Sequence, residues 1–70
     1  MSISKSSSFK QLVTFHKVAR SGSVSQAARE LFISQSAASI QLANLEEATG
    51  TKLINRTGRG IRLTPAGEKL

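Results

Sequence analysis

The chain has 70 residues, with ten Lys or Arg against four acidic residues, and a formal net charge of +6 that indicates a polyanionic partner. A domain of this size buries only about 60% of the surface its unfolded chain exposes, which disfavours an enclosed substrate cavity and therefore an enzyme. The absence of cysteine excludes disulfides and thiolate metal sites, and no apolar run is long enough for a membrane span or a signal peptide, so we expect a cytoplasmic protein.

The N-terminal region predicts a short tail followed by a helix. Residues 1–7 are serine-rich and polar, which is typical of a flexible N-terminal tail. Ser8 and Gln11 have the spacing of a capping box, and apolar residues then recur at helical intervals as far as Ser21. We therefore expect the first helix, and the domain spanning residues 8–64, to begin at Ser8.

Two further helices follow at a separation that is typical of a helix-turn-helix. Ser23 and Gln26 repeat the capping pattern ahead of a short amphipathic helix that ends near Leu31. Ser34 then predicts the N-cap of a third helix, after a turn of about three residues. The small residues Ala27 and Ala28 would let the two helices cross closely.

The third helix is expected over residues 34–49, with Gly50 as its left-handed cap. Four residues fall within about 60° of one another and predict its buried stripe: Ala38, Leu42, Leu45 and Thr49. Polar and small residues point elsewhere near its N-terminal end: Gln35, Ser36, Ser39 and Ala43. In a helix-turn-helix this is the end that enters the major groove.

The last twenty residues predict a basic hairpin and a fourth helix. Residues 51–70 hold five basic residues and one acidic residue, a net charge of +4. Residues 53–56 and 61–64 are typical of short strands around a glycine-rich turn at 57–60, so a wing is expected over residues 52–64. Thr64 and Pro65 indicate a helix start, and a helix over 65–70 that continues through Leu70 suggests a fragment of a longer chain.

Many of these residues together resemble the LysR-type bacterial transcriptional regulators over residues 9–69. The resemblance is carried by Phe15, Gly22-Ser23, Ala27-Ala28, Leu31, Ser34-Gln35, Ser39, Leu45-Glu46, Gly50, Leu53, Arg56 and Leu63-Thr64-Pro65-Ala66-Gly67. It implies a mainly α fold with a small β-hairpin, a winged helix-turn-helix. It also implies a transcription regulator of the bacterial cytoplasm and nucleoid that binds an interrupted palindrome in double-stranded DNA as a homodimer or tetramer.

The resemblance further implies a long linker helix beginning near Pro65 and a C-terminal domain that binds a small-molecule effector. No cofactor is expected in the present domain. The sequence departs from the family pattern at Ser36, where proline is frequent, at Ile40, where arginine or another polar residue is frequent, and at Ile54, where phenylalanine is usual. At Ile40 the base-reading pattern changes, and contact with a thymine methyl is one replacement.

Candidate contact residues fall into two groups. Base contacts in the major groove are expected from Gln35, Ser36, Ser39 and Ile40, with solvated helix positions and helix-start serines as the alternative. Contacts to phosphates or the minor groove are expected from Ser23, Ser34, Lys52, Arg56, Thr57, Arg59 and Arg62, although basic residues often form only a solvated face. Arg59, between two glycines, is the strongest wing candidate, and Ser23 and Ser34 also serve as caps.

Other readings remain open at this point. The chain could be a protein–protein interaction module with an incidental basic wing. An enzyme lacks support, because His16 has no second metal ligand type nearby and the side chains of Glu46 and Glu47 diverge by about 100° on a helix. Glu46 is expected to pair with a nearby basic residue, and Lys10 and Arg29 are secondary candidates for backbone contacts.

Overall fold

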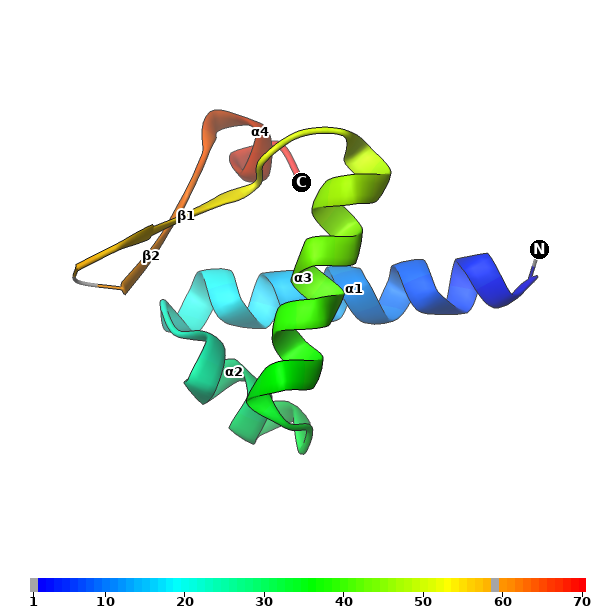
Figure 1. The fold of residues 1–70 in the computed structure, drawn as a ribbon, viewed down its shortest axis with the longest axis horizontal. Helices are drawn as coiled ribbons and strands as arrows, with labels where there is room; N and C mark the ends of the chain where they lie inside the picture. The colour runs from blue at the N-terminus through cyan, green and yellow to red at the C-terminus, as the bar shows by residue number, and fades with distance from the viewer. Residues whose placement is uncertain (1, 59) are drawn as a thin grey trace.

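The computed structural model describes residues 2–58 and 60–70, with side chains from Phe9 onward. Four helices and two strands follow one another along the chain (Figure 1): α1 (Ser2–Ser21), α2 (Val24–Leu31), α3 (Gln35–Thr49), β1 (Ile54–Thr57), β2 (Gly60–Leu63) and α4 (Pro65–Glu68). In Figure 1, α3 crosses in front of α1, α2 lies beside both, and the hairpin projects from the side of the helices. This is a winged helix-turn-helix, as the sequence predicted.

The first helix begins earlier than expected. α1 starts at Ser2, so Ser8 lies inside it and the helix start predicted at Ser8, after an irregular tail, is wrong. No glycine or proline stands between Ser2 and Phe9 to stop a helix, and each residue added to an existing helix gains one hydrogen bond. The helix that is anchored by its apolar residues from Leu12 onward therefore extends toward the N-terminus.

The core lies where the three long helices meet and where the hairpin joins them. Phe15 and Val18 of α1 are almost completely buried, against small residues of α2 and α3, and Leu53 closes the core from the base of the hairpin. Ala27, Ala28 and Ala38 are also buried, which lets the helices approach closely. A salt bridge of 3.4 Å between Lys17 and Glu30 joins α1 to α2 at the surface.

The predicted caps are present at both helices of the helix-turn-helix. The hydroxyl of Ser23 accepts a hydrogen bond from the backbone amide of Gln26 at 3.1 Å, and Ser34 accepts one from Ala37 at 3.0 Å. Gly50 ends α3 in the left-handed conformation, with φ of 72°. The buried stripe of α3 is confirmed except at Thr49, which is exposed and donates its hydroxyl back to the carbonyl of Leu45.

The turn between α2 and α3 contains an unusual residue. Phe32 takes the left-handed conformation, with φ of 59°, and its side chain is 93% exposed. The amide of the next residue, Ile33, donates to the carbonyl of Ala28 at 3.0 Å, in the arrangement that commonly ends a helix on glycine. A phenylalanine at this position costs backbone strain and gains no burial.

The C-terminal elements differ by small shifts from the prediction. Each strand lies one residue closer to the turn than expected. At the loop end Thr57 pairs with Gly60, and at the other end Thr64 leaves the strand to cap α4. The Thr64 hydroxyl accepts from the amide of Gly67 at 3.1 Å and donates to the carbonyl of Lys52 at 2.7 Å. α4 ends at Glu68 and does not continue through Leu70 as predicted.

Candidate nucleic-acid interface

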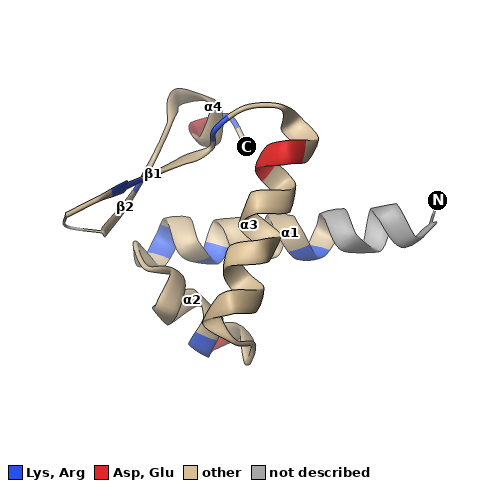
Figure 2. Cartoon of the chain, viewed as in Figure 1, with Lys and Arg blue, Asp and Glu red and all other residues tan. Residues whose placement is uncertain are grey.

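The exposed N-terminal half of α3 carries no charge. Between Gln35 and Leu45 there is no acidic or basic residue, whereas Glu46 and Glu47 follow at the C-terminal end (Figure 2). Gln35 and Ser36 are exposed in the first turn, which the Ser34 cap holds in helical geometry. Because carboxylates and a helix C-terminus both repel phosphates, a polyanion can approach α3 only toward its N-terminal end.

A hollow of about 360 Å³ separates α3 from the hairpin. It is lined on the helix by residues including Ser39 and Ala43, and on the hairpin side by residues including Lys52, Asn55 and Arg56. Ser39 is half-buried there, while Lys52 and Arg56 are exposed. The fold thus brings one predicted base-contact residue and two predicted phosphate-contact residues to the same concave surface.

A second hollow lies where the starts of α2 and α3 face the hairpin. It is lined by residues including Ser23, Ser25, Gln35, Arg56 and Thr57. Ser25, exposed in the first turn of α2, was missed by sequence reasoning, as was Asn55 in the first hollow. In the sequence, Ser25 is marked only by its closeness to a helix cap, and Asn55 only by its place next to Arg56. That α2 and the hairpin face each other is a result of tertiary packing.

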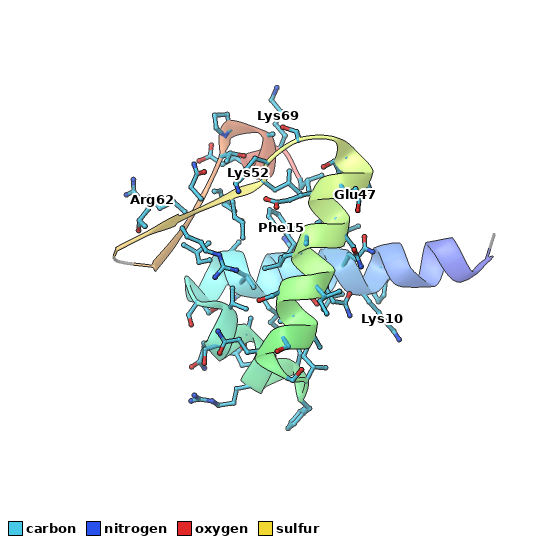
Figure 3. The ribbon with its side chains drawn as sticks, in the orientation of Figure 1. Lys10, Phe15, Glu47, Lys52, Arg62 and Lys69 are labelled. Carbon is cyan, nitrogen blue, oxygen red and sulfur yellow. The ribbon has the colours of Figure 1, made fainter. Side chains whose placement is uncertain are left out.

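The two arginines of the hairpin strands lie on opposite faces. Arg56 pairs with Ile61 and Asn55 pairs with Arg62 in the antiparallel register, and side chains alternate along a strand. Arg56 therefore shares a face with buried Ile54 and lines both hollows. Arg62 extends away from the helices in Figure 3. Arg59 lies outside the described residues, so its contact with DNA stays a prediction.

The hairpin is held to the helices through β2. The amide of Ile61 donates to the carbonyl of Gly22 at 3.3 Å, across the turn that precedes α2. Gly60 has φ of 129°, and a Cβ at this residue would lie 2.9 Å from the Gly22 oxygen. At the loop, the Thr57 hydroxyl donates to the carbonyl of Gly60 at 3.1 Å. Glycine at position 60 thus permits the close approach of the hairpin to the helix-turn-helix.

Glu46 anchors the base of the hairpin to α3. One carboxylate oxygen of Glu46 accepts hydrogen bonds from the amides of Leu53 at 2.8 Å and Ile54 at 3.2 Å. The expected pairing of Glu46 with a basic side chain is therefore replaced by two backbone amides. The sequence did not predict this role. Nothing near Glu46 indicates that the amides of Leu53 and Ile54, seven and eight residues further along, need an acceptor outside the sheet.

Ile40 lines a different hollow from the two that border the hairpin. It lines a hollow with Ala37 and Asn44 of α3 and with Lys10 and Gln11 of α1. The structure therefore does not place Ile40 together with Ser39 and Arg56, although all were predicted to contact DNA.

His16 is exposed on α1 and its ring lies edge-on to that of Phe15. Among the described residues there is no group of metal-ligating side chains and no helix suited to spanning a membrane.

Comparisons with known proteins identify relatives of this chain. The model of the lysR family of bacterial regulatory helix-turn-helix proteins matches residues 9–68. The HTH-type transcriptional regulator TdcA of Escherichia coli is 44% identical over 59 residues, which are 84% of this chain and 19% of the relative. The regulator YofA of Bacillus velezensis is 48% identical over 59 residues, again 84% of this chain and 20% of the relative. The chain thus spans about a fifth of the length of these relatives.

Among solved structures, the DNA-binding domain of CbnR in a complex with DNA is similar to this chain. It superposes with a TM-score of 0.83 at 41% identity, over 87% of this chain and 70% of that domain. The match to the family model, over residues 9–68, includes every helix and hairpin residue that lines the two hollows. The chain therefore belongs to the lysR family of bacterial regulatory helix-turn-helix proteins.

Proposed function

We propose that this chain binds double-stranded DNA in a sequence-dependent manner as the DNA-binding domain of a transcription regulator. In this proposal the N-terminal half of α3 enters the major groove, and the hairpin lies on the flanking phosphates and minor groove. The observation that carries the proposal is the position of Arg56, which lines both the hollow beside Ser39 and the hollow beside Gln35. A cation there meets phosphate while α3 meets base edges.

The surface chemistry supports a division between specificity and affinity. The uncharged side chains of Gln35, Ser36 and Ser39 can form hydrogen bonds with base edges, and contribute nothing to nonspecific attraction. The basic residues Lys52, Arg56 and Arg62 neutralise phosphates of any sequence. The DNA-binding domain of CbnR, which shares this fold, was solved in a complex with DNA, and this supports DNA as the ligand of the present chain.

Two measurements on the purified chain test the proposal together. Selection of duplexes from a random pool should yield a preferred sequence, and binding to both that sequence and random duplexes should weaken as salt is added. If no duplex sequence is preferred, α3 does not read base edges. Absence of any binding, even at low salt, would favour the alternative of a protein–protein interaction module, for which the comparisons offer no support.

For the intact protein we propose a homodimer or tetramer that senses a small molecule through a further domain, as the resemblance to the LysR-type regulators implies. The relatives, of which this chain spans about a fifth, are long enough to hold such a domain. The present 70 residues should then be mainly monomeric and bind a half-site weakly. Sedimentation at several concentrations tests this. A tight dimer at low concentration would contradict it, by showing that these residues are sufficient for pairing.

A further inference from the structure

The most prominent apolar side chain on α3 is Ile40. It is 60% exposed, whereas the apolar residues on the opposite side of the helix, such as Leu42 and Leu45, are buried. Residues three and four positions away are its neighbours on the helix surface: Ser36, Ala37, Ala43 and Asn44. Ser36, Ala37 and Ala43 have much shorter side chains than isoleucine, so Ile40 projects past them.

The surroundings of Ile40 fit the floor of a DNA groove and not its phosphate rim. No charged residue lies between Gln35 and Leu45, so this part of α3 has no group that would hold a phosphate by charge. Basic side chains are found on both sides instead: Lys10 lines the hollow beside Ile40, and Lys52 and Arg56 line the hollow beside Ser39. With phosphates held at these flanks, the centre of α3, including Ile40, is the part that meets base edges.

One base presents a matching apolar group in the major groove. The C5-methyl of thymine is the apolar feature by which the major groove distinguishes a T·A pair. Because Ile is β-branched, its χ1 angle is strongly restricted in a helix, so little conformational freedom is lost when it packs on a methyl group. Its exposed surface also leaves water only if an apolar partner covers it.

We propose that Ile40 is a specificity-determining residue that recognises the C5-methyl group of a thymine in the bound duplex. This inference rests on the proposed function and makes it more specific, since it names the chemical group that one residue reads. Burial of one methyl group corresponds to about a fourfold change in affinity.

The test uses the duplex selected from a random pool and versions of it with single thymines replaced by deoxyuridine, which lacks only the methyl. For the unaltered chain, at least one replacement should weaken binding about fourfold. Ile40→Ala should bind the thymine and deoxyuridine duplexes equally at that position. Because Ile40 is exposed, this variant should fold, which circular dichroism can verify.

Phe9→Ala serves as the matched control, since Phe9 is also a large exposed apolar residue, 68% exposed, but lies on α1. It should keep the fourfold discrimination. If no deoxyuridine replacement weakens binding, if the preferred duplex has no required thymine, or if Ile40→Ala keeps the discrimination, the assignment of Ile40 is overturned while sequence-dependent binding stands. If no duplex is preferred over random DNA, it is the proposed function that fails.

Discussion

The third helix and the hairpin differ in charge and in the way they are attached to the domain. α3 buries Ala38, Leu42 and Leu45 along its length and carries no charge over its N-terminal half. The hairpin buries only Ile54 among its described strand residues and carries Arg56 and Arg62. A two-stranded hairpin is marginally stable by itself, so it depends on its attachments to the helices. The well-buried, uncharged α3 is thus suited to selecting a sequence, and the less buried, basic hairpin to attracting phosphates.

The largest change in the free energy of unfolding should come from removing the hydrogen bonds by which Glu46 of α3 holds the base of the hairpin. Glu46→Ala removes the acceptor for the amides of Leu53 and Ile54, both partly shielded from water. Loss of two charge-assisted hydrogen bonds should lower the free energy of unfolding by about 2 to 4 kcal/mol, measured by urea denaturation.

Glu47→Ala is the control for that experiment, because Glu47 is the exposed neighbour of Glu46 on α3 (Figure 3). It should change the free energy of unfolding by no more than about 0.5 kcal/mol. Equal effects of the two substitutions would show that the carboxylate of Glu46 does not stabilise the base of the hairpin.

The next largest effect concerns the selectivity of α3. Gln35→Ala removes an exposed amide in the first turn of the helix and should cost about 1 to 3 kcal/mol on the preferred duplex, with little change on random DNA. Titration of both duplexes at one salt concentration gives the comparison. Equal weakening of the two would mean that Gln35 does not read a base.

Substitutions in the hairpin should change affinity for DNA of any sequence, and the two faces of the hairpin should differ in the size of this effect. Arg56 faces the helices, so Arg56→Ala should weaken binding to all sequences and reduce the slope of log affinity against log salt by about one. Arg62 extends from the opposite face, so Arg62→Ala should change the slope less (Figure 3). A larger change from Arg62→Ala would place the duplex on the outer face of the hairpin.

The smallest effect is expected at the turn between α2 and α3, away from the hairpin. Phe32→Gly should raise the free energy of unfolding by about 0.5 to 1 kcal/mol, because glycine adopts the left-handed conformation without the strain of a Cβ and an exposed ring contributes no packing. Phe32→Ala keeps the Cβ and should not give this gain. Thermal unfolding of both variants distinguishes relief of strain from simple removal of an exposed ring.

Local chemistry in the sequence was sufficient to predict most elements. The caps at Ser23, Ser34 and Thr64, and the left-handed glycine at position 50, are confirmed because each depends on residues only a few positions apart. The start of α1 was mistaken, because serine-rich composition was taken as a sign of irregular structure although nothing in residues 2–8 stops a helix.

The candidate interface was predictable only in part. The sequence identified Gln35, Ser39 and Arg56 as candidates, from their places on a helix and a strand, but it did not bring them together around two hollows. It also treated Arg56 and Arg62 alike. Their separation onto opposite faces follows from the alternation of side chains along paired strands, in which Arg56 lies opposite Ile61 and Arg62 lies opposite Asn55.

By itself, the sequence determined the helix-turn-helix, the basic hairpin and the resemblance to the LysR-type regulators, because helical periodicity, capping and turn chemistry act over short distances along the chain. Only the tertiary structure decided that Glu46 holds the hairpin through two backbone amides, that Arg56 faces α3, and that Ile40 lines a separate hollow beside Lys10. These arrangements join residues from separate elements, and packing of the shared core sets them.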